Sequence, residues 1–143
     1  MAEPGGGFVL LDGANELAGV RHLWWVVRHW PILRRGMTSS PGYIKHRVWF
    51  IPKRTIGLTS FWEDAGSAYR FAHSPAHLLF WRWGAQPGHT RGGWLAIYRY
   101  VEGGPLWGNG VDAMVRAFAG HVPAPTNQPA RTPPPGAAPN PGA

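Results

Sequence analysis

The chain has 143 residues, which without its proline-rich end leaves room for one domain of roughly 110 residues. It contains no cysteine, which excludes a disulfide scaffold, a thiolate metal site and a cysteine nucleophile. The longest apolar run, Leu23 to Val27, is far shorter than the roughly 20 residues that cross a bilayer. The N-terminus lacks the basic and apolar regions of a secretory signal, so we expect a cytoplasmic protein.

Positive charge is concentrated in one part of the chain. The formal net charge is +7, and the segment 17–61 holds eight of the 14 basic residues and no carboxylate. These eight are Arg21, Arg28, Arg34, Arg35, Lys45, Arg47, Lys53 and Arg54. A positive face attracts nucleic acid, an anionic membrane or an anionic ligand, although a solvated surface is the simpler interpretation. Nucleic acid ranks last, because no DNA- or RNA-binding motif accompanies the charge.

The first predicted elements are a short strand and a helix. The apolar run 8–11 predicts a brief buried strand, after which Asp12 or Asn15 caps a helix. The apolar residues of this helix, which follow the 3.6-residue period, are Leu17, Val20, Trp24 and Val27. Pro31 predicts a break or kink, with a short continuation to Gly36, because proline lacks an amide donor and clashes with the preceding turn.

A hairpin and a second helical region follow. The alternating runs from Tyr43 to Ile51 and from Thr55 to Trp62 are separated by a tight connection, which predicts two antiparallel strands. Glu63 and Asp64 predict the start of a helix that runs to about Trp83, since carboxylates cap and complement a helix N-terminus.

The end of the chain completes the expected fold. The run from Trp94 to Val101 predicts a fourth strand, and 112–119 a last short helix. We expect a flexible segment at 1–7, a domain at 8–121, and a disordered tail at 122–143, where eight of 22 residues are proline. The order β-α-β-β-α-β is that of the ferredoxin-like α+β fold, a four-stranded antiparallel sheet with its helices on one face.

The stretch 59–77, TSFWEDAGSAYRFAHSPAH, resembles a strand-to-helix signature of dimeric α/β-barrel proteins. It is most similar to spheroidene-monooxygenase-like proteins and related uncharacterised small-monooxygenase-like domains. The shared features are a Trp at the strand's end, an acidic helix start, the pair Phe71-Ala72 and His77. The resemblance implies a homodimer whose two sheets meet as a barrel, with a ligand pocket between sheet and helices. Members include oxygenases with and without haem, isomerases and cyclases, so the fold does not choose the reaction.

His73 and His77 are the predicted catalytic residues. Their spacing of four would place both on one face of an unbroken helix, but Pro75 interrupts it. Ser74 and Pro75 together predict an N-cap and first helical residue, so the helix restarts with His77 beside its positive end. There the imidazole should stay neutral near pH 7, able to accept a proton or to ligate a haem iron. A packed or capping histidine is the competing interpretation, and a zinc site lacks a third ligand.

Four further residues are predicted to bind substrate: Trp62, Tyr69, Arg70 and Phe80. Trp62 borders the pocket or belongs to the core. Arg70 would neutralise an anionic substrate or a haem propionate, or is simply solvated. The cofactor is left open between haem and none.

The resemblance thus implies a monooxygenase-like enzyme for a hydrophobic compound, polycyclic or terpenoid. His77 would be its base or haem ligand. Two alternatives use the same pocket: a non-catalytic ligand-binding or stress-related dimer, and a cofactor-free isomerase or cyclase. The expected partners are a hydrophobic small molecule and a second copy of the chain.

Overall fold

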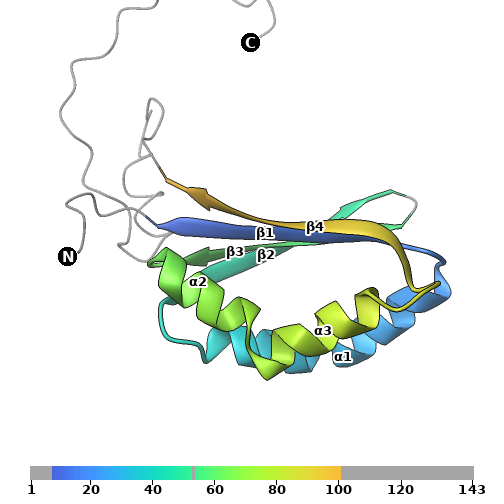
Figure 1. Ribbon diagram of the computed structural model, residues 1–143, viewed down its shortest axis with the longest axis horizontal. Helices are drawn as coiled ribbons and strands as arrows, with labels where there is room; N and C mark the ends of the chain where they lie inside the picture. Colours follow the sequence, from blue (N-terminus) through green and yellow to red (C-terminus); the bar gives the residue numbers. More distant parts are fainter. Residues whose placement is uncertain (1–7, 53, 101–143) are drawn as a thin grey trace, which may run out of the picture.

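The computed structural model describes residues 8–52 and 54–100, which form a four-stranded sheet with helices covering one face (Figure 1). The elements are β1 (Val9–Leu17), α1 (Arg21–Thr38), β2 (Tyr43–Ile51), β3 (Thr55–Trp62), α2 (Ala65–Ala72), α3 (Pro75–Gly84) and β4 (Thr90–Arg99). The strand order is β2-β3-β1-β4 and every neighbouring pair is antiparallel. The predicted ferredoxin-like α+β fold is confirmed. The predicted segment 1–7, helix 112–119 and tail 122–143 lie outside the described residues.

β1 is longer than the sequence pattern predicts. The apolar run ends at Leu11, but the strand continues to Leu17 and pairs with β3 on one side and β4 on the other. Asp12 and Asn15, predicted as helix caps, therefore lie inside a central strand, and that prediction is wrong. Ladder hydrogen bonds from two neighbours outweigh the weak strand preference of an Asp-Gly-Ala-Asn segment.

α1 turns a different face toward the sheet from the one predicted. Its buried residues are Val26, Leu33 and Met37. Three of the four residues of the predicted apolar stripe are exposed: Val20 at 73%, Trp24 at 70% and Val27 at 55%. The fourth, Leu17, ends β1. The helix also continues through Pro31, so the predicted break does not occur. α1 carries two apolar stripes, and only one of them packs on the sheet.

The local signals after β3 are confirmed. Asp64 caps α2, its carboxylate accepting a hydrogen bond from the backbone N–H of Ser67 at 2.8 Å. The helical region divides at Ser74, whose hydroxyl accepts from the N–H of His77 at 3.3 Å, and α3 starts at Pro75. β4 begins at Thr90, before the predicted start at Trp94.

The core lies between the covered face of the sheet and the helices. Its buried members are Val9, Leu11, Leu33, Met37, Trp62, Ala68, Phe71 and Ala72. Trp62 is fully buried at 0% exposure and stacks on Phe71 with ring centroids 5.1 Å apart. Its indole Nε1 donates a hydrogen bond to Ser60 Oγ at 2.9 Å, so this large side chain is buried without an unpaired polar atom.

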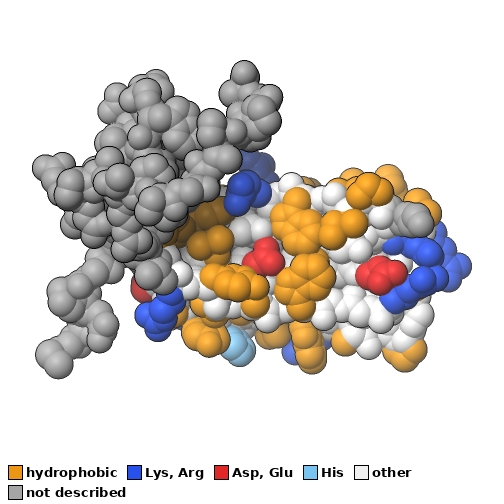
Figure 2. Space-filling view, turned by 90° about the horizontal axis from the view of Figure 1, so that it is seen from above, with side chains coloured by type: hydrophobic (Ala, Val, Ile, Leu, Met, Phe, Trp, Pro, Cys, Tyr) orange, Lys and Arg blue, Asp and Glu red, His pale blue; other side chains and the backbone are white. Residues whose placement is uncertain are grey.

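None of the described helices covers the opposite face of the sheet, and hydrophobic side chains gather there around a carboxylate (Figure 2). Asp12 accepts hydrogen bonds from Thr59 Oγ1 at 2.6 Å and from Trp94 Nε1 at 3.1 Å. Trp49 Nε1 donates to the same Thr59 hydroxyl at 3.0 Å, and its ring packs directly on Gly57, where a side chain would collide with it. The polar atoms of these side chains are therefore paired with one another. Within residues 8–52 and 54–100, no helix combines the length and hydropathy that crossing a bilayer requires.

Candidate functional site

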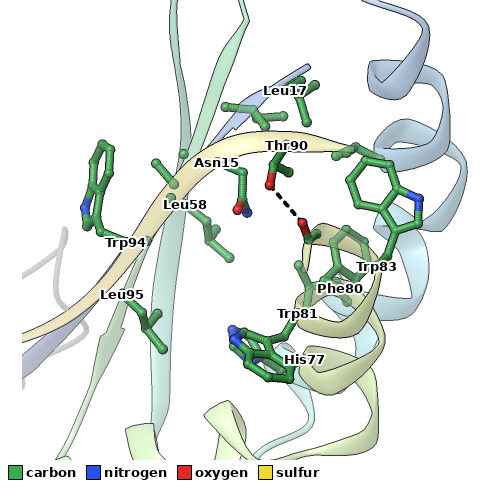
Figure 3. Close-up of a pocket in the computed structure, with 18 of the residues that line it drawn as sticks. Asn15, Leu17, Leu58, His77, Phe80, Trp81, Trp83, Thr90, Trp94 and Leu95 are labelled. Atoms are coloured by element: carbon green, nitrogen blue, oxygen red, sulfur yellow. Dashed lines mark hydrogen bonds between the residues drawn. The ribbon is translucent and has the colours of Figure 1, made fainter. Parts of the chain in front are cut away.

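A cavity of about 400 Å³ lies between the covered face of the sheet and the helices α1 and α3 (Figure 3). Its size falls in the range of small-molecule sites, about 300–1,000 Å³. Its apolar walls include Leu11, Leu17 and Leu58 from the sheet, Val26, Trp30 and Leu33 from α1, and Phe80 and Trp83 from α3. Such a lining favours a hydrophobic ligand of modest size.

The cavity reaches solvent between α3 and β4. Two residues that line it there are strongly exposed, Trp81 on α3 at 63% and Leu95 on β4 at 50%. Gly92 and Gly93 also belong to the lining, and they place bare backbone where β4 passes the cavity. Ligand therefore has a route in that does not require the sheet and helices to separate.

His77 supplies the cavity with its titratable group. Its Nδ1 lies 2.8 Å from the carbonyl oxygen of Ala72, and because a carbonyl only accepts, Nδ1 must carry the proton. In the neutral ring Nε2 then holds a free lone pair, and no described residue bonds to it. Burial lowers the pKa of His77 below its ordinary value of 6.5, with a smaller lowering from His73, while the Ala72 bond acts the other way. At neutral pH the side chain is an unprotonated base in apolar surroundings.

The ring of His77 is held in place from two sides. Ser74 and Pro75 fix the start of α3, and the hydrogen bond to Ala72 ties the ring to the end of α2. Phe71 meets it edge to face, with ring centroids 5.3 Å apart. The Ser-Pro pair encodes the break between α2 and α3, and this break determines the orientation of the His77 imidazole.

The structure brings together only some of the predicted site residues. His77 and Phe80 both line the cavity, and Phe80 packs edge to face on Trp25. Trp62 belongs to the core and is not part of the lining. The remaining three, His73, Tyr69 and Arg70, are exposed and lie outside the lining.

Two of these three exposed side chains, those of His73 and Arg70, make local hydrogen bonds. His73 Nδ1 donates to the carbonyl of Tyr69 at 2.8 Å. Arg70 donates to Ser67 Oγ at 2.8 Å, beside the cap of α2. Both side chains therefore bond within α2 and its C-terminal end, outside the cavity lining.

Sequence reasoning missed the polar groups at the far end of the cavity. Asn15 and Thr90 line it, and Thr90 Oγ1 donates to the carbonyl of Gly84 at 2.8 Å (Figure 3). Trp83 lines the same end, stacked on Trp25 at 4.2 Å between ring centroids. If the first strand had been predicted to extend to Leu17, the alternation of side chains would have placed Asn15 on the same face as Leu11, and so in the cavity wall.

The residues around the cavity do not fit haem. The single imidazole of His77 would be enough to ligate the iron, but the lining holds no Arg or Lys that would pair with the propionates. Among the described residues no group of three or more His, Cys, Asp or Glu side chains is arranged to hold a metal ion.

No protein-family model and no curated protein matches the chain, whereas several solved structures share its fold. SnoaB, a cofactor-independent oxygenase from Streptomyces nogalater, has 13% identity and a TM-score of 0.54 over 68% of this chain and 97% of its own. An antibiotic biosynthesis monooxygenase has 10% identity and a TM-score of 0.56 over 66% and 99%. A dimeric ferredoxin-like protein of unknown function from Jannaschia has 14% identity and a TM-score of 0.54 over 64% and 98%. At such identities the likeness establishes the fold alone.

Proposed function

We propose that this protein is a monooxygenase-like enzyme that takes a hydrophobic polycyclic or terpenoid compound into the cavity and acts on it without haem. One observation carries the proposal: His77 presents an unprotonated Nε2 in an apolar cavity, because Nδ1–H is committed to Ala72. The fold shared with SnoaB, a cofactor-independent oxygenase, supports this choice of chemistry.

The role of His77 is to remove a proton from the bound substrate. A methylene group between aromatic or carbonyl groups is acidic enough for an imidazole base to attack, and its anion is electron-rich enough to react with O₂. In the overall reaction the CH₂ group becomes a ketone, with one oxygen atom in the product and the other in water. The protein contributes the base, a fixed orientation and exclusion of water by walls such as Phe80 and Leu58.

We also propose that the working unit is a homodimer formed through the uncovered face of the sheet. Tyr98 and Trp94 are about half exposed there, and Asp12, Thr59 and Trp49 have already paired their polar atoms within the face. The Jannaschia neighbour of the same fold is described as dimeric. Burying such a face removes apolar surface from water, and the hydrogen bonds that Asp12 accepts from Thr59 and Trp94 offset part of the cost of burying its carboxylate.

The test uses dithranol, a tricyclic anthrone with an acidic methylene group, and follows O₂ consumption with an electrode after subtraction of the uncatalysed rate. His77→Asn keeps a side-chain N–H for the Ala72 carbonyl but has no basic nitrogen. Loss of a general base typically lowers the rate about 10²–10⁴-fold. His73→Asn is the matched control, since His73 makes the same kind of bond to Tyr69 but lies outside the cavity.

The alternatives give different results. Tight binding of dithranol with no O₂ uptake, and no effect of His77→Asn on affinity, would indicate a non-catalytic ligand-binding dimer. Proton exchange at the methylene carbon without O₂ uptake would indicate an isomerase. A Soret band that appears on adding haem to wild-type protein and is lost in His77→Asn would contradict the haem-free chemistry.

A further inference from the structure

The outward face of α1 carries an apolar stripe that nothing in the described structure covers. Val20, Trp24 and Val27 are all exposed, and they recur at the helical period along this face. They lie opposite Val26 and Leu33, which pack on the sheet and line the cavity. An exposed helical stripe containing a Trp needs a partner that accepts apolar side chains.

Arginines border this stripe. Arg21, Arg28 and Arg35 are spaced seven residues apart, close to two helical turns, so they form one line along the exposed side of the helix. All three are exposed. On a helical projection at 3.6 residues per turn this line runs beside Trp24, while Arg34 flanks the stripe on its other side, next to Val27.

These positive charges have no acidic partners in the described part of the chain. Neither α1 nor α3, its neighbour in the helical layer, contains a carboxylate. The salt bridge found among the described residues joins Arg91 to Glu16 and involves neither helix. The surface formed by α1 and α3 is therefore cationic, and its complement is a surface of high negative charge density.

We propose that α1 docks this protein on an anionic lipid bilayer, lying in the plane of the interface. The apolar stripe would enter the boundary between headgroups and acyl chains, and the arginine line would bind lipid phosphates. The stripe decides between a bilayer and a nucleic acid. A polyanion in water would pair with the arginines but leave Val20, Trp24 and Val27 exposed, whereas a bilayer accepts both sets.

Docking through α1 would hold the cavity close to the bilayer. The same helix forms a wall of the cavity through Val26, Trp30 and Leu33, so a docked protein holds its cavity beside the phase in which apolar compounds dissolve. The dimer proposed above uses the opposite face of the sheet and leaves α1 free. The docking stands independently of the proposed chemistry, because bilayer binding is measured without substrate.

The experiment is sedimentation of the full chain with vesicles of equal parts phosphatidylglycerol and phosphatidylcholine, and with vesicles of phosphatidylcholine alone. Binding is expected only with the anionic vesicles and should weaken with added salt. Each basic residue near such a surface contributes about 1 kcal/mol, so Arg21→Gln/Arg28→Gln should lower the partition coefficient roughly 30-fold. Arg70→Gln/Arg99→Gln, the same change of charge at exposed positions on α2 and β4, should lower it much less.

Trp24→Ser tests the apolar half of the proposal and should also weaken binding, with the thermal unfolding midpoint unchanged because the side chain is exposed. The proposal is overturned if anionic vesicles do not bind, if Trp24→Ser has no effect, or if the Arg70/Arg99 pair matters as much as the Arg21/Arg28 pair. Tighter binding to duplex DNA than to the anionic vesicles, at equal charge concentration and salt, also overturns it.

Discussion

Replacement of Trp62 separates a structural role from a ligand-binding one. The side chain is fully buried, stacks on Phe71, meets Tyr43 edge to face at 5.7 Å, and donates to Ser60. Trp62→Ala should lower the free energy of unfolding by about 3–5 kcal/mol, a large part of the total of about 5–15 kcal/mol for a small domain. Trp62→Phe keeps the ring stack and should cost about 1–3 kcal/mol. Ser60 then keeps a partner, since its hydroxyl also donates to the Leu11 carbonyl.

Urea unfolding followed by far-ultraviolet circular dichroism measures this cost, and dithranol titration measures the cavity. Trp62→Phe should lower the unfolding midpoint, at an unchanged slope, and leave dithranol affinity within about twofold, because a loss of stability of this size leaves the fold populated. Phe80→Leu, in the cavity wall, should weaken dithranol binding and change the unfolding midpoint less than Trp62→Phe does. An unchanged midpoint together with weaker dithranol binding in Trp62→Phe would refute the assignment of Trp62 to the core.

Two further outcomes are expected. Acid should destabilise the protein below pH 6.5: burial lowers the folded-state pKa of His46 and of His77 below 6.5, so the unfolded chain takes up protons first. The contribution of the two neutral histidines to the free energy of unfolding is complete above pH 6.5 and is lost as the pH falls. Urea unfolding at several pH values should show that this free energy falls less with acid in His77→Asn than in wild type. Tyr98→Asp, on the uncovered sheet face, should shift native mass spectra from dimer to monomer because it would bury a charge. Arg82→Asp on α3 should not, and dimers in both variants would contradict the proposed interface.

Signals confined to a few residues proved sufficient for much of the fold. The hairpin of β2 and β3 follows from alternation, and the cap of α2 from Asp64. The restart of α3 follows from Ser74 and Pro75, because a hydroxyl at N-cap and a proline at N1 act within one helical turn. That same local signal located His77, the residue on which the proposed chemistry depends.

The choice of buried faces was decided by tertiary structure. α1 has apolar residues on two sides, so periodicity detects a helix but cannot say whether Val26 or Trp24 meets the sheet. Packing against the sheet and α3 settles it, and the face left over is the one proposed to meet a bilayer. The sequence left Trp62 as either a core residue or a pocket wall, and in the structure it stacks on Phe71 within the core.

By itself the sequence determined the order of the elements, the single antiparallel sheet and the helix restart, because each depends on neighbours within a turn or a strand. Only the tertiary structure extended β1 through Asp12 and Asn15, since that segment is a strand only when β3 and β4 pair with it. Only packing of α1 and α3 on the sheet formed the cavity and placed the His77 imidazole in its lining. Contacts between residues far apart in the chain define these features, and no periodicity in the sequence encodes them.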